Sequence, residues 1–131
     1  MKKSIILTIG ILAFLASITQ AKSYDDIFPE KTSFGYVPIG QNGSKFFYWM
    51  AHSRNNPAKD PLVFWFQGGP GGSSLFGLFF EMGPFYIKNQ GDDHATLRPN
   101  AWNNNANIVF IDHPIDVGFS VGQTKDLPHN A

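Results

Sequence analysis

The 131-residue sequence contains no cysteine, so disulfide bonds cannot stabilise it. It also lacks an excess of charge, because ten lysines and arginines balance ten aspartates and glutamates. No basic run interrupts this balance, which argues against a nucleic-acid partner. After residue 21, no apolar run approaches the roughly 20 residues of a membrane-spanning helix. The histidines and carboxylates lack the spacing of a known metal site, so we expect neither a metal nor another cofactor.

Residues 1–21 have the composition of a secretory signal peptide. Lys2 and Lys3 precede an apolar stretch from Ile5 to Ile18, and small residues then lead to a cleavage point before Lys22. The stretch is short for a membrane span, so an uncleaved anchor is the less favoured alternative. We therefore expect a mature chain of residues 22–131 that enters the secretory pathway and reaches the extracellular space, a lysosome or a vacuole.

Asn42 begins a possible N-glycosylation sequon, Asn42-Gly43-Ser44, in an apparent turn. A glycoprotein would agree with the secretory route. An unused sequon agrees with the sequence equally well.

The segment Leu62 to Ser74, LVFWFQGGPGGSS, combines a strand, a glycine-rich turn and the start of a helix. Its apolar beginning, 62–66, is typical of a buried central strand. Ser73 and Ser74 are suited to cap a helix over 73–81. The glycines allow a ligand to approach the main chain closely, and the helix start leaves N–H groups unpaired. This segment therefore predicts a site for negative charge, either a phosphate or the oxyanion of an acyl-transfer reaction.

The residues of this loop argue against a phosphate. A P-loop needs a lysine before the helix hydroxyl, whereas this loop has none and contains Pro70. The dinucleotide fingerprint needs a third glycine at the position of Ser74. The oxyanion is the favoured occupant, and a tight turn without any ligand is the alternative.

The remaining pattern predicts two strands, a loop and a further strand. The ranges 34–39 and 45–52 are aromatic and β-branched, and a glycine-containing turn joins them, so we expect a hairpin of edge strands. The range 89–105 is rich in Gly, Asp and Asn and predicts a long surface loop. Asn107 to Ile111 predicts a second buried strand that ends at Asp112.

Gly118-Phe119-Ser120-Val121-Gly122 matches the G-x-S-x-G pattern of a nucleophile elbow. An elbow places its serine on a sharp turn between a strand and a helix, and no helical pattern follows Ser120. Ser120, Asp126 and His129 are also too close in sequence to be positioned as a triad by separate strands. We therefore expect Ser120 to be structural.

Three segments resemble the serine carboxypeptidase family, in the family's order and spacing. Trp65 to Ser74 is similar to its W-L-N-G-G-P-G-C-S-S, and Phe79 to Phe85 to its F-x-E-N-G-P-F. The third segment, WNNNANIVFIDHPIDVGFS, is similar to its W-N-x-x-A-N-x-x-F-I-D-Q-P-x-x-x-G-F-S. The likeness extends from about residue 33 to 122. It implies an α/β fold, namely the incomplete N-terminal part of the mixed sheet of an α/β-hydrolase.

The resemblance implies a serine-type carboxypeptidase, a hydrolase that releases C-terminal residues from peptides or proteins through an acyl-enzyme. In this fold the triad Ser, Asp and His come from later strands, so the resemblance implies that they lie beyond Ala131. The 131 residues alone would then be an inactive N-terminal fragment, with the strand at 107–111 exposing an apolar edge. A noncatalytic secreted protein that binds carboxylates or peptides, and an acyltransferase of the same fold, are the alternatives.

The resemblance also implies roles for individual residues. The backbone N–H of Gly69 would donate to the oxyanion, while Trp65, Gln67, Gly68 and Glu81 would recognise the free α-carboxylate of the substrate. A glutamate beside a bound carboxylate requires a shared proton, which implies that acidic pH favours activity.

The sequence departs from the quoted family patterns at several positions. Gln67 replaces an asparagine, Gly72 replaces a cysteine that usually forms a disulfide, and His113 replaces a glutamine. The absent cysteine implies that this branch lacks the bridge or leaves its partner unpaired.

Overall fold

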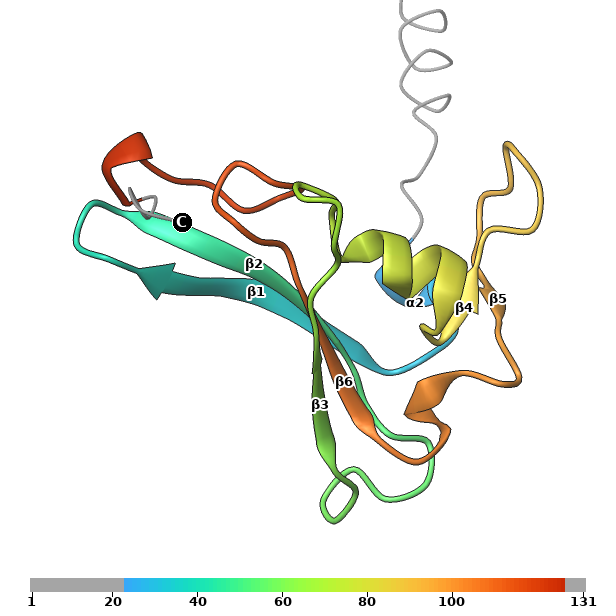
Figure 1. The fold of residues 1–131 in the computed structure, drawn as a ribbon. Coiled ribbons are helices and arrows are strands. Elements are labelled where there is room, and N and C mark those ends of the chain that lie inside the picture. The colour runs from blue at the N-terminus through green and yellow to red at the C-terminus, as the bar shows by residue number, and fades with distance from the viewer. Residues whose placement is uncertain (1–22, 127–131) are drawn as a thin grey trace, which may run out of the picture.

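The computed structural model describes residues 23–126 (Figure 1), so the predicted signal peptide lies outside the described residues. The helical elements are α2 (Tyr24–Ile27), the π-helix η1 (Gly77–Glu81) and two 3₁₀ turns, η2 (Trp102–Asn104) and η3 (Thr124–Asp126). The strands are β1 (Thr32–Ile39), β2 (Ser44–Ala51), β3 (Leu62–Trp65), β4 (Phe85–Tyr86), β5 (Thr96–Leu97) and β6 (Asn107–Ile111).

Four strands form a mixed sheet in the order β1-β2-β6-β3. β1 and β2 form the predicted hairpin, because Thr32 pairs with Ala51 and Ile39 with Ser44. β6 is antiparallel to β2 and parallel to β3. The prediction that both hairpin strands are edge strands was wrong for β2, since β6 pairs with its second edge.

The core lies on one face of this sheet, and Figure 1 shows α2 and the helical segment that ends with η1 on the same side. Alternate residues of β2 and β6 point into it. Its buried members are Phe47, Trp49, Ala51, Leu78, Met82, Phe85, Ala95, Ile108 and Phe110. Each large apolar side chain of this set contributes about 1.5–3 kcal/mol through burial.

The structure reverses the expected positions of the two apolar strands. β6 was expected to expose an apolar edge, but it lies between β2 and β3, and Ile108 and Phe110 are completely buried. β3 was expected to be central, yet it is an edge strand with Leu62 52% and Phe64 54% exposed. An apolar run shows that a strand is buried in its complete sheet. It does not show whether the strands that pair with it on both sides lie in the same part of the chain.

The predicted helix over 73–81 is shorter and differs in type. Helical structure covers 75–81, and its last five residues form the π-helix η1. Met82 N and Gly83 N both donate to Gly77 O, which closes the helix before the predicted Gly83-Pro84 stop. A side chain at Gly83 would come within 1.9 Å of Leu78 O, so only glycine fits this ending.

The predicted loop over 89–105 contains some regular structure. β5 pairs with β4, and η2 precedes β6. Arg54 donates to Arg98 O and Asn104 Oδ1, which attaches this segment to the end of β2.

Asp126 fastens η3 to the hairpin turn. Its carboxylate accepts hydrogen bonds from Asn42 Nδ2 and Ser44 Oγ, each 2.5 Å long. These hydrogen bonds lower the pKa of Asp126 below its usual value, and the bond from Ser44 has a larger effect than the bond from Asn42.

We predict that replacing Asp126 by Asn lowers stability at neutral pH. Because the pKa of Asp126 is lower in the folded state than in the unfolded state, its contribution is complete above about pH 4. The contribution is lost only as pH falls through the lowered folded value. Urea unfolding of full-length wild type and Asp126→Asn between pH 7 and pH 3 measures this. A stability difference that disappears between pH 7 and pH 5 would contradict the assignment, and exposed Asp25, replaced by Asn, is the control.

Candidate active site

The loop after β3 turns sharply through its glycines. Gly69 has φ 140° and Gly71 has φ 87°, a region that side chains other than glycine rarely adopt. The peptide bond between Gly69 and Pro70 is cis. A Cβ atom at position 69 would also lie 3.1 Å from Gly72 N. The predicted glycine-rich turn is therefore confirmed.

This loop contains a series of unpaired main-chain donors. Among residues 23–126, no hydrogen bond is donated by the backbone N–H groups of the loop at Gly68, Gly69, Gly71, Gly72 and Ser73. These residues are exposed or half-buried, so the donors are accessible to a ligand. Such a loop can bind negative charge without breaking any existing hydrogen bond.

The loop is attached at both of its ends by serines. Ser73 Oγ accepts from Leu75 N, as a helix cap does, and Phe76 N donates to Ser73 O. Ser74 does not act as a cap, contrary to the prediction. Its hydroxyl instead accepts from Gln67 N at 3.1 Å and donates to Ile111 O at 2.5 Å, because the side chain points back into the sheet.

Trp65 and Gln67 interact directly. Trp65 Nε1 donates to Gln67 Oε1 at 2.9 Å, and the indole ring packs edge-on against Trp102 at 6.0 Å between centroids. A Cβ at Gly72 would lie 3.2 Å from Gln67 Cγ and 2.7 Å from Gly68 O. Gln67 thus uses space that a side chain at position 72 would need.

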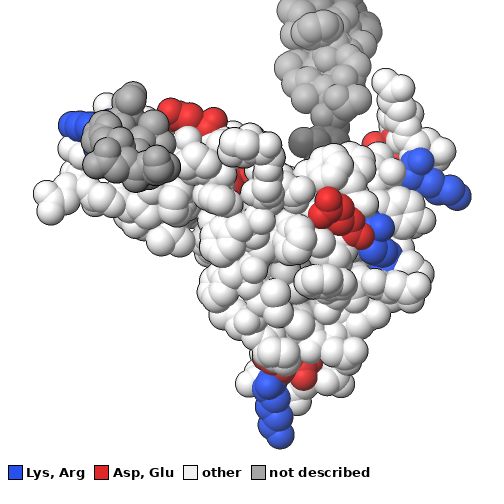
Figure 2. All heavy atoms as spheres, in the orientation of Figure 1, with Lys and Arg blue, Asp and Glu red and all other residues white. Residues whose placement is uncertain are grey.

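An open pocket of about 390 Å³ lies beside this loop. Its polar wall comes from the loop and its apolar wall from the helical segment. The lining residues are Gln67, Gly68, Gly72, Ser73, Leu75, Phe76, Phe79 and Phe80. Most of the face in Figure 2 is uncharged. The pocket itself combines the free N–H groups of the glycine loop with the aromatic side chains of the helical segment.

Phe76 and Phe80 line the pocket, although neither was predicted as a site residue. Their rings pack 5.1 Å apart, and both side chains are more than half exposed. Two phenylalanines spaced i, i+4 on the exposed face of a short helix were the signal available in the sequence.

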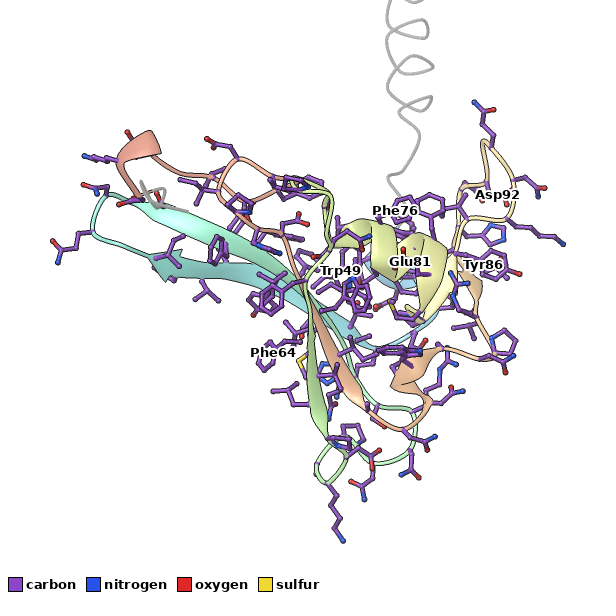
Figure 3. The ribbon with its side chains drawn as sticks, in the orientation of Figure 1. Trp49, Phe64, Phe76, Glu81, Tyr86 and Asp92 are labelled. Carbon is purple, nitrogen blue, oxygen red and sulfur yellow. The ribbon has the colours of Figure 1, made fainter. Side chains whose placement is uncertain are left out.

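The predicted site residues lie close together along the chain but not all in the pocket. Gln67 and Gly68 line it, and Trp65 orients Gln67. Gly69 lies in the loop itself. Glu81 is exposed at the end of η1 and does not line the pocket; Figure 3 shows it with Phe76 on the helical segment.

Ser120 is buried, as expected of a structural residue. Its Oγ accepts from Phe47 N at 2.8 Å and donates to Asp112 O at 2.6 Å. No helix begins directly after it: Val121 pairs with Lys45 in an isolated bridge, and the short 3₁₀ turn η3 starts only at Thr124. The nucleophile-elbow interpretation of the G-x-S-x-G motif is therefore wrong.

His113 follows β6 and packs edge-on against Phe66, with 5.0 Å between ring centroids. Its Nε2 atom is buried without a hydrogen-bond partner in the described part of the chain. The structure gives no reason for a histidine at this position.

The family profile described as serine carboxypeptidase matches residues 23–131. The chain belongs to the serine carboxypeptidase family. Carboxypeptidase Y of Saccharomyces cerevisiae is 49% identical over 87 residues, which are 66% of this chain and 16% of that protein. Carboxypeptidase S1 of Penicillium janthinellum is 51% identical over 93 residues, 71% of this chain and 21% of that protein. A vacuolar serine-type carboxypeptidase of S. cerevisiae, ATG42, is 48% identical over 92 residues, 70% of this chain and 17% of that protein.

A solved structure supports the fold. The crystal structure of Kex1Δp, a prohormone-processing carboxypeptidase from S. cerevisiae, is 30% identical with a TM-score of 0.62, covering 79% of this chain and 23% of its own. The mixed sheet is therefore the predicted incomplete α/β-hydrolase sheet. The chain spans about a fifth of the length of these relatives. Within residues 23–126, no helix is long and apolar enough to cross a membrane.

Proposed function

We propose that this chain supplies the oxyanion loop and the carboxylate-binding residues of a serine-type carboxypeptidase that releases C-terminal residues from peptides or proteins. The observation that carries the proposal is the glycine loop, whose free N–H groups line up beside a pocket in a member of this family. The nucleophile and its acid and base partners would come from later strands of the full-length protein.

Gly69 N–H is the proposed oxyanion donor. It has no competing hydrogen bond among the described residues, and its positive φ fixes the direction of the loop. The residue after the nucleophile would supply the second donor. One such donor stabilises the transition state by about 3–4 kcal/mol.

The free α-carboxylate of the substrate would bind to Gln67, Gly68 and Glu81. Trp65 holds the Gln67 carbonyl, which leaves the amide NH₂ group free to donate to a carboxylate. The aromatic wall formed by Phe76 and Phe80 would then contact the side chain of the last substrate residue. Glu81 would have to approach the pocket from the end of η1 when substrate binds.

The test uses the full-length protein and a blocked dipeptide with a free C-terminal carboxylate. We expect release of the last residue, and at least a 10-fold loss of kcat/KM for the matching C-terminal amide, because hydrogen bonds to the carboxylate are then lost. Equal cleavage of acid and amide, or cleavage inside a longer peptide, would contradict the proposal. Transfer of the acyl group to an alcohol instead of water would indicate an acyltransferase.

Replacing Glu81 by Gln in the full-length enzyme should change the pH dependence of substrate binding. Two carboxylates bind side by side only when they share a proton, so wild-type KM should rise with increasing pH. The amide of the variant donates without a titrating proton, and its KM should stay nearly constant from pH 4 to pH 7. Steady-state kinetics with the same dipeptide measures both curves. Parallel KM curves would remove Glu81 from the carboxylate site.

The secretory pathway is the compartment that best fits this activity. One relative is named as a vacuolar enzyme, and Asn42 of the sequon is exposed in the hairpin turn. The Asn42 nitrogen that would carry a glycan donates to Asp126, so a glycan there would have to be accommodated beside η3.

A further inference from the structure

We propose that Ser74 and Asp112 are positioning residues that hold the oxyanion loop in its donating geometry. This inference rests on the proposed function. It concerns two buried side chains that do not reach the pocket but contact both ends of the loop that forms it.

Ser74 connects the loop to the sheet. The side chain is completely buried, and its hydroxyl joins Gln67 N, at the start of the loop, to Ile111 O, at the end of β6. One oxygen thus fixes the beginning of the loop against the neighbouring parallel strand. Without the Ser74 hydroxyl, Gln67 N would lose its acceptor and Ile111 O would lose its donor.

Asp112 connects the end of the loop to the same strand end. It is 1% exposed, and its Oδ1 accepts from Ser73 Oγ at 2.7 Å and from Ser74 N at 2.8 Å. Its Oδ2 accepts from Phe119 N at 2.9 Å. A side chain at Gly118 would come within 2.0 Å of Oδ2, so the following loop closes tightly over the carboxylate.

These contacts divide the loop into fixed ends and a free centre. Residues 73 and 74 are hydrogen bonded to Ile111 and Asp112 at the end of β6, and Gln67 N is held by Ser74 Oγ. Within residues 23–126, the N–H groups of Gly68, Gly69, Gly71 and Gly72 have no hydrogen-bond partner. An oxyanion hole works because its donors are already oriented before charge develops. Main-chain donors have no rotamers of their own, so their orientation depends on how the two ends are held.

The test compares Ser74→Ala with Ser120→Ala in the full-length enzyme. Ser120 is 3% exposed, and its hydroxyl likewise joins a strand N–H, that of Phe47, to a main-chain carbonyl at the end of β6. Both variants lose one donor and one acceptor at similar burial, so a purely structural role predicts equal effects. The Ser120 hydroxyl bonds to β2 and to the main chain of Asp112, and neither of these two hydrogen bonds involves the glycine loop.

We expect Ser74→Ala to lower kcat about 10- to 100-fold with KM changed less than about threefold, because the donors move while substrate binding is largely kept. The variant should also lose affinity for a peptide boronate, which mimics the tetrahedral intermediate, by a similar factor. Ser120→Ala should keep kcat within about twofold at a comparable loss of melting temperature.

The inference is overturned by any of the following outcomes. Equal kcat in Ser74→Ala and Ser120→Ala would make Ser74 structural only, provided that the wild type hydrolyses the peptide acid. A wild type without hydrolysis would overturn the proposed function, and the positioning role with it. If Ser74→Ala does not fold, Ser73→Ala serves instead, since half-buried Ser73 loses its bond to Asp112 at lower structural cost. Unchanged kcat in that variant would also contradict the inference.

Discussion

Replacing Gly69 by Ala in the full-length enzyme is expected to lower kcat/KM by about 100- to 1,000-fold. The substitution is unfavourable for two reasons. A φ of 140° is strained for any residue with a Cβ, and that Cβ would lie 3.1 Å from Gly72 N. A change in φ at residue 69, or a movement away from Gly72, should rotate the N–H of residue 69 away from the substrate. Steady-state kinetics should show the loss in kcat, because the oxyanion forms only after substrate is bound.

Gly91→Ala is the matched control for backbone strain. Gly91 has φ 91°, and nothing lies within 4 Å of a Cβ there, in a loop outside the pocket. It should lose stability without losing kcat. If both variants lose kcat equally, the effect of position 69 is one of folding, and Gly69 is not the oxyanion donor.

Residues 23–131 produced without the rest of the protein are expected to self-associate and to show no peptide hydrolysis. In the part of the chain that the structure describes, no strand pairs with the outer edge of β3, and Leu62 and Phe64 in this strand and Phe66 after it are each about half exposed. A free apolar strand edge pairs readily with other chains. Light scattering should detect particles larger than a monomer at micromolar concentration.

Phe64→Lys should reduce this association more than Val37→Lys. Val37 is 49% exposed on β1, the opposite edge of the sheet, where Gly35 and Pro38 already weaken strand pairing. A lysine at position 64 places charge on the edge that lacks such protection. A monomeric wild-type segment, or an equal effect of the two lysines, would show that β3 is not the associating edge.

The sequence was sufficient to predict the hairpin and the two apolar strands of the four-stranded sheet. The turn at residues 40–43 produced the β1–β2 hairpin, and the apolar run at 107–111 produced β6, because spacing and turn residues are local signals. The neighbours of each strand were not predictable in this way. β3 has the composition of a central strand, yet its second neighbour does not lie among the described residues. Strand order depends on the whole sheet.

The site was predictable to a similar extent. The glycine pattern predicted the loop at 67–74, and the resemblance to the family directed attention to Trp65, Gln67 and Glu81. The roles of Ser74 and Asp112 depend on contacts between residues more than 35 positions apart, which no local pattern contains. The fit of Gln67 beside Gly72 was not predictable either, because it depends on how the turn between the two residues folds.

The most direct test of the account is a crystal structure of the full-length protein with a peptide boronate bound to its nucleophile. The account predicts that one boronate oxygen lies about 2.7–3.1 Å from Gly69 N, with the loop ends still bonded to Ser74 and Asp112. The substrate side chain should lie along Phe76 and Phe80. A boronate oxygen directed away from residues 68–72, with Gly69 N–H facing solvent, would contradict it.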